Sequence, residues 1–178
     1  TAPGATNSAG LPLRWSETEN VKWQTAIPDQ SWSTPVILGR QIWLTTASET
    51  EAKPEEAQRR LKTNTGDQPV TVLEKVELRA VCVDRESGKL LHNILLLTVR
   101  EPQWMHRLNS YASPTPVLGD GKLFVHFGAL GTAALDIKAG KVLWRNTELT
   151  VMHENGPGSS PVLWRDLLIF HMDGSDRQ

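Results

Sequence analysis

Apolar residues along this chain occur in short runs that repeat, separated by polar and glycine-containing turns. Three segments begin with a proline followed by an apolar pair, and an apolar triplet starts seven residues after each proline. Short runs of this kind, closed by Gly or Asp turn residues, predict antiparallel pairs of strands. The prolines are Pro35, Pro116 and Pro161, and the triplets begin at Ile42, Leu123 and Leu168.

A second unit follows the first two pairs. An aspartate and a glycine stand four residues apart, as Asp84 and Gly88 and again as Asp136 and Gly140. Aspartate early and glycine late in a turn suit the positive φ that a tight reversal needs. Each complete repeat therefore predicts four strands, of which the third ends at the aspartate and the fourth carries Trp144 in the second copy.

The spacing of the copies predicts a fold class. Pro116 and Pro161 are 45 residues apart, which is the length of one four-stranded propeller blade. Pro35 and Pro116 are 81 residues apart, and most of the excess is an insertion of 29 residues at about 48–77. Within it, residues 52–62 predict a short helix, because Pro54 stands near the first turn and acidic residues precede basic ones. A solvated surface helix is the main interpretation, and a lid or partner contact is the alternative.

The predicted architecture is all-β. The main interpretation is a β-propeller of four-stranded antiparallel blades, and the alternative is a β-sandwich whose repeated segments are similar by chance. Because propellers need about four to eight blades to close, the chain is expected to be an incomplete arc of a seven- or eight-bladed ring. Other blades or another chain would complete it. The expected parts of this single partial domain, 1–178, are a lead-in at 1–20, a closing-type strand at 21–27, blades at 32–97 and 112–147, and a half blade at 159–178.

The stretch Ala134–Trp144 resembles the tryptophan-docking repeat, AxDxxxGKxxW, of the pyrroloquinoline-quinone (PQQ) repeat β-propellers. The first copy has Cys82 in place of the alanine and His92 in place of the tryptophan, and residues 10–23 look like the opening of the extracytoplasmic members. The resemblance implies that these residues lock neighbouring blades together. The implied docking residues are Trp23, Asp84, Gly88, Lys89, Ala134, Asp136, Gly140, Lys141 and Trp144.

The charge and composition of the chain argue against some classes of binding partner. Nineteen basic and twenty acidic residues leave a net charge of −1, which argues against nucleic-acid binding and against a polybasic membrane clamp. No apolar run approaches the roughly 20 residues of a membrane span. Residues 1–10 do not have the pattern of an export signal. The resemblance implies a periplasmic or secreted protein whose signal is not in this chain.

The single cysteine bears on catalysis. Cys82 has no second cysteine for a disulfide or a cysteine-based zinc site, and its apolar neighbours predict a small buried filler. The resemblance extends to quinone-dependent dehydrogenases, which carry a vicinal cysteine pair and a calcium ion. We therefore expect a non-catalytic scaffold with no cofactor that binds a protein or a polar small molecule or glycan. The alternative is a PQQ-dependent dehydrogenase whose quinone and calcium site is completed by other blades.

The alternation of strand direction predicts where a site would lie. All long connections fall on one face of the predicted disc, and those before the second and third blades each carry a histidine and an asparagine. Three interpretations remain open: side chains that brace the loops, a polar ligand pocket, and a metal site of His106, His153 and His171 with Glu154 or Asp173. The candidate residues are His106, Arg107, Asn109, Tyr111, His153, Glu154, Asn155, His171 and Asp173.

Overall fold

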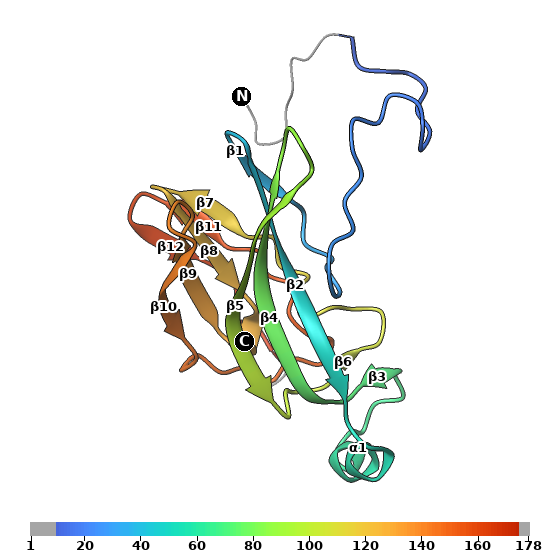
Figure 1. The fold of residues 1–178 in the computed structure, drawn as a ribbon. Helices are drawn as coiled ribbons and strands as arrows, with labels where there is room; N and C mark the ends of the chain where they lie inside the picture. Colours follow the sequence, from blue (N-terminus) through green and yellow to red (C-terminus); the bar gives the residue numbers. More distant parts are fainter. Residues whose placement is uncertain (1–9, 175–178) are drawn as a thin grey trace.

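The computed structural model describes residues 10–174, and its regular structure is mostly β (Figure 1). Two four-stranded antiparallel sheets follow one another along the chain, each with neighbouring strands in sequence order. A hairpin and a two-residue pair, β3 with β6, complete the strands, so the all-β prediction is confirmed.

The first sheet contains β1 (Val36–Leu38), β2 (Gln41–Glu51), β4 (Leu73–Asp84) and β5 (Leu90–Arg100). The second contains β7 (Val117–Gly119), β8 (Lys122–His126), β9 (Thr132–Asp136) and β10 (Lys141–Asn146). The smaller elements are α1 (Pro54–Leu61), β3 (Val70–Thr71), β6 (Met105–His106), the 3-10 turn η1 (Gly128–Leu130), and the hairpin of β11 (Val162–Trp164) and β12 (Leu167–Ile169).

The turns between the third and fourth strands form as the Asp–Gly spacing predicts. The Oδ1 atom of Asp84 accepts the backbone N–H of Ser87 at 2.7 Å, and Oδ1 of Asp136 accepts that of Ala139 at 2.8 Å. Hydrogen bonds to the charged form lower the pKa of each carboxyl. The first cause is the Ser87 hydroxyl, at 2.8 Å, for Asp84 and the Ala139 N–H for Asp136. The turn glycines, Gly88 and Gly140, both have positive φ, at 71° and 63°. The two copies are therefore the same local structure.

The insertion does not form a simple surface loop. Residues 46–51 of β2 pair with residues 73–79 of β4, so much of the insertion lengthens two strands of the first sheet. The helix α1 spans Pro54–Leu61, slightly less than predicted, with Pro54 in its first turn and acidic residues ahead of basic ones. The guanidinium of Arg60 anchors it by donating to the carbonyl oxygens of Leu73, at 2.7 Å, and Pro102.

The sheets stack side by side with equivalent strands adjacent. Strand β7 lies between β1 and β11, and β10 lies beside β5 (Figure 1). One hydrogen bond recurs at both junctions: the backbone N–H of Thr34 donates to the hydroxyl of Thr115 at 3.1 Å, and that of Thr115 donates to the hydroxyl of Ser160 at 2.9 Å. The main apolar core fills the space between the two large sheets, around buried side chains such as Trp43, Leu78, Leu123 and Leu135.

The strand expected at residues 21–27 is not formed, and this prediction is wrong. The segment crosses the face of the first sheet, where Trp23 and Ile27 pack against Leu44, Val81 and Val83 (Figure 1). The chain joins the edge of β2 only after this segment, where Gln30 bridges to Ala47 beyond the short strand β1. Side chains hold it instead, as where Trp23 Nε1 donates to the carbonyl of Arg85 at 2.8 Å.

Glycine turns receive large rings from a neighbouring segment. The Trp23 ring lies against Gly88, where a Cβ would come within 2.7 Å of its Cδ2 atom, and the imidazole of His92 lies against Gly140 at a corresponding 3.0 Å. His92 thus occupies at the second turn the place that Trp23 occupies at the first. Trp144 is 41% exposed and contacts Phe124 of its own sheet. Of the other implied docking residues, Ala134 is buried, whereas Lys89 and Lys141 are exposed.

Parts of two predicted segments, residues 1–9 of the lead-in and 175–178 of the half blade, lie outside the described residues. Across residues 10–174, no helix has both the length and the apolar character that crossing a membrane requires.

Candidate functional site

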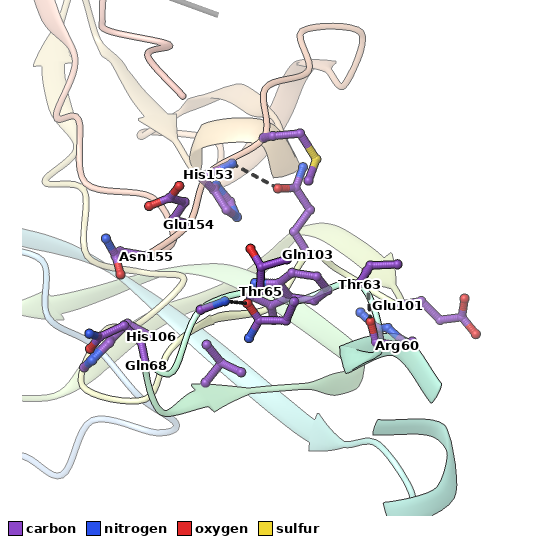
Figure 2. A pocket seen from close by; sticks show the side chains of 15 residues that line it. Arg60, Thr63, Thr65, Gln68, Glu101, Gln103, His106, His153, Glu154 and Asn155 are labelled. Carbon is purple, nitrogen blue, oxygen red and sulfur yellow. Dashed lines mark hydrogen bonds between the residues drawn. The ribbon is translucent and has the colours of Figure 1, made fainter. Parts of the chain in front are cut away.

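A cavity of about 840 Å³ opens where the lengthened first sheet meets the connections of the chain (Figure 2). Three segments form its walls: the end of α1 with the loop after it, the connection from β5 into β6, and the connection before β11. Eleven of its 15 lining residues are polar or charged, and the other four are Gly66, Val70, Trp104 and Met152. Those used below are Arg60, Gln68, Gln103, Trp104, His106, His153, Glu154 and Asn155.

Backbone pairing fixes the first two walls to each other. Val70 of β3 pairs with His106 of β6, and the N–H of Arg107 donates to the carbonyl of Pro69 at 2.8 Å. Arg60 binds Pro102 in the same connection as well as Leu73 of β4. The insertion and the β5–β6 connection therefore form one braced unit.

Gln103 joins the second wall to the third. Its Oε1 accepts the backbone N–H of His153 at 3.1 Å, as Figure 2 shows, and its Nε2 donates to the carbonyl of Val151 at 2.8 Å. The backbone carbonyl of Gln103 accepts the hydroxyl of Tyr111, which is buried in the core. One glutamine thus positions His153 at the cavity wall.

His153 is the most unusual side chain of the site. It is 9% exposed, and neither ring nitrogen has a hydrogen-bond partner among residues 10–174. Burial lowers the pKa of its imidazole, so the ring is neutral at pH 7. A buried polar group without a partner costs about 1–3 kcal/mol, and this cost falls when a ligand or water supplies the missing bond.

A second, smaller cavity of about 230 Å³ lies on the other side of His153 and includes His126. The Nδ1 atom of buried His126 lies 2.9 Å from the hydroxyl of Thr132, and its ring stacks on Phe170 with 3.9 Å between centroids. Burial lowers its pKa to about 4. His171 and Asp173 form an exposed pair at the rim, with Nδ1 and Oδ2 3.3 Å apart.

The structure separates the histidines of the hypothetical metal site. His106 lines the large cavity, His171 lines the small one, and His153 lies between them. Within residues 10–174, no group of three or more His, Cys, Asp or Glu side chains is placed to hold a metal ion. Cys82 is buried in β4, and desolvation raises the pKa of its thiol to about 11. The dehydrogenase alternative places the completion of its quinone and calcium site in other blades, and it stays a prediction.

Several candidate residues have a structural place instead. The amide of Asn109 donates to the carbonyls of Asn155, at 2.7 Å, and Pro157, at 3.2 Å, so it braces the two connections. Tyr111 lies in the core, and the side chain of Arg107 does not line either cavity. The structure brings His106, His153, Glu154 and Asn155 together at the large cavity.

Other lining residues were not among the candidates. Gln103 and Trp104 stand three and two residues before the predicted His106 in the same connection, and that proximity was a usable signal. Arg60 and Gln68 lie in the insertion, where no pattern in the sequence indicated which side chains turn toward the connections. Neither a scan against protein-family models nor a search of curated proteins gave a match for this chain. The site is therefore interpreted from its own chemistry.

Proposed function

We propose that the two large sheets and the hairpin are consecutive blades of a PQQ-repeat-type β-propeller. We call the first sheet, the second sheet and the β11–β12 hairpin modules. The recurring hydrogen bond from Thr34 to Thr115 and from Thr115 to Ser160 supports this arrangement, because it joins each module to the next in the same way. The placement of Trp23 on Gly88 and of His92 on Gly140 supports it as well. In such a propeller, β1, β7 and β11 are the innermost strands.

The proposed function is a binding scaffold for a polar, hydroxyl-rich small ligand such as a short glycan. The observation that carries it is the large cavity, which three braced segments line with polar side chains and a tryptophan. Amides, carboxylates and imidazoles donate and accept the hydrogen bonds that hydroxyl groups need. Trp104 adds an apolar ring surface, and a pocket of this size suits a small molecule.

The hydrogen bonds of the cavity histidines do not include a nucleophile–base pair. Among residues 10–174, neither His106 nor His153 is hydrogen-bonded to a hydroxyl, thiol or carboxylate side chain. The activated nucleophile–base pairs of covalent catalysis need such a contact. On the resemblance alone we further propose that the protein acts in the periplasm or outside the cell.

Glycan-array screening followed by calorimetry with the best short saccharide tests this function. Trp104→Ala and Glu154→Ala remove two lining side chains, and each should weaken binding about tenfold, or about 1.4 kcal/mol. Glu148→Ala is the matched control, since Glu148 is exposed and does not line either cavity. Absence of saccharide binding, or binding that both lining variants leave unchanged, would contradict the proposal.

A further inference from the structure

The two buried histidines of the chain, His126 and His153, differ in how their rings are held. Burial lowers the pKa of both, so each imidazole is neutral at pH 7. The ring of His126 is fixed, because it stacks on Phe170 and its Nδ1 atom lies 2.9 Å from the hydroxyl of Thr132. Among residues 10–174, the ring of His153 has neither a stacked ring nor a hydrogen bond. Only one of these two rings is therefore held by its neighbours.

The contacts that anchor His153 act on its backbone. Gln103 accepts the N–H of His153 at 3.1 Å and donates to the carbonyl of Val151 at 2.8 Å. The side chain of His153 lies at the wall of the large cavity, between Gln103 and Glu154 (Figure 2). A half-turn about the Cβ–Cγ bond exchanges ring nitrogens with ring carbons of nearly the same size. The ring can therefore turn in place while its backbone stays where Gln103 holds it.

The unpaired ring gives the cavity a polar group that a ligand can satisfy. A neutral imidazole has one N–H donor and one nitrogen acceptor. Both nitrogens of His153 are buried without a partner within residues 10–174, and a bond from a ligand offsets the cost of that burial. A hydroxyl donates and accepts, so it can bond either nitrogen, whereas an ammonium group only donates and a carboxylate only accepts. A hydroxyl therefore suits both tautomers of this ring.

The charges of the cavity disfavour an acidic ligand group near His153. Arg60 is the only lysine or arginine among the 15 lining residues, and its guanidinium already donates to the carbonyls of Leu73 and Pro102. Glu154, the next residue after His153, adds a carboxylate to the same wall. An acidic group would meet this carboxylate without a free cation to offset it, whereas a hydroxyl carries no charge.

We propose that His153 is the residue by which the large cavity recognises one hydroxyl group of its ligand, with the ring turned to place a nitrogen against that hydroxyl. Gln103 is then a positioning residue, because it sets the place of the ring. This role of His153 rests on the proposed function, since it concerns the ligand of the same cavity. A site built to bond a hydroxyl rejects an analogue that lacks it, because its own buried polar group is left unpaired.

Nitrogen NMR of the histidine rings tests whether the ligand reaches this side chain. The best short saccharide from the array, added to saturation, should shift the ring nitrogens of His153, because one of them gains a hydrogen bond. The ring nitrogens of His126 should keep their shifts, since Thr132 and Phe170 already hold that ring. Unchanged shifts of His153 at saturation would overturn the proposed role.

Calorimetry with the monodeoxy analogues of that saccharide identifies the hydroxyl. With the unmodified protein, one analogue should bind about tenfold more weakly than the parent. With His153→Phe, which keeps a flat ring without nitrogens, the parent and that analogue should bind equally. His153→Asn keeps a donor and an acceptor, so it should retain part of the difference. A purely structural role of this position would not give that rescue.

His126→Phe is the matched control, because it makes the same replacement at a buried histidine that does not line the large cavity. It should leave the difference between parent and analogue unchanged, and circular dichroism checks that each variant is folded. If no saccharide binds the unmodified protein, the proposed function itself fails. If saccharides bind and His153→Phe discriminates among the analogues as the unmodified protein does, the proposed function stands and the role of His153 is overturned.

Discussion

The two four-stranded sheets share one plan over part of their length and then diverge. Five ladder pairs of β2 and β4, from Gln41–Asp84 to Thr45–Ala80, correspond one by one to the five pairs of β8 and β9. In the second sheet the ladder stops at His126–Thr132, and the short turn around η1 closes it. In the first sheet six more pairs continue to Glu51–Leu73 and carry α1 beyond them.

This difference separates the stacking of the modules from the construction of the site. The shared pairs hold the side chains and turns by which modules contact each other, such as Trp43 and Gly88. The additional ladder adds Ala47, Leu73, Val76 and Leu78 to the main core, and it extends the first sheet to the connections before β6 and β11. The cavity forms there. An insertion that lengthens strands can thus build a pocket without altering the repeat beneath it.

The largest expected loss of stability comes from substitutions in the five ladder pairs that the two sheets share. Trp43 and Phe124 occupy equivalent positions, but Trp43 is fully buried and stacks on His92, whereas Phe124 is half-buried. Trp43→Ala should lower the free energy of unfolding by about 3–5 kcal/mol and Phe124→Ala by about 2 kcal/mol. Denaturant titration measures both. Equal losses would show that the two positions are not differently packed.

The next effect concerns the equivalent turns. Gly88→Ala combines a positive φ with a Cβ 2.7 Å from the Trp23 ring, and it should cost about 2–3 kcal/mol of unfolding free energy. Gly140→Ala, against His92, should cost somewhat less. Gly39→Ala is the matched control with positive φ and open space around it, and it should cost about 1 kcal/mol. If all three variants lose the same amount, the rings do not dock on these turns.

A third substitution affects only the added part. Arg60→Met removes two hydrogen bonds from α1 to backbone carbonyls, and hydrogen exchange in α1 should become about tenfold faster. Exchange in β8 and β9 should stay as it is. Arg59→Met is the control, because Arg59 pairs with Glu56 of the same helix, at the surface. Faster exchange throughout the first sheet would mean that the insertion supports the sheet rather than the reverse.

The smallest expected effect is a pH dependence of stability at the end of the β8–β9 ladder, where the first sheet has no histidine. His126 of β8 stands where β2 has Thr45, and its folded pKa of about 4 lies below the roughly 6.5 of the unfolded chain. As pH falls from 7 to 6, the unfolded state takes up the proton first, so stability should drop by less than about 1 kcal/mol. His126→Asn should reduce this drop, because it removes the buried imidazole. An unaltered pH dependence in His126→Asn would contradict the burial of that ring.

Local signals made the repeat predictable from sequence. The proline-led pairs and the Asp–Gly turns are closed by residues a few positions apart, so their strands and reversals follow from local chemistry. The ladder beyond Thr45 was not predictable, because Thr46–Glu51 is largely polar and resembles a loop. Its partners come from the far side of the insertion. Residues 21–27 have the composition of a strand, but Trp23 and Ile27 pack on the face of the first sheet instead of pairing at an edge.

The site was predictable only in part, for a related reason. The connections that hold His106 and His153 were identified by their composition, but the direction of each ring depends on distant residues. Gln103 positions the backbone of His153, and the β3–β6 pair places His106. The cavity also needs the insertion as its third wall, and nothing in that segment alone indicates which connections it meets.

Crosslinking between modules tests the central claim most directly. In Thr34→Cys/Thr115→Cys and in Thr115→Cys/Ser160→Cys, oxidation should form a disulfide within one chain, because these residues are hydrogen-bonded neighbours in consecutive modules. Buried Cys82 should take no part. Peptide mass spectrometry should find both links and should find no link within one chain in Thr34→Cys/Ser160→Cys, two modules apart. Failure of both adjacent links, or a bond from 34 to 160 within one chain, would contradict the stacking of these modules in sequence order.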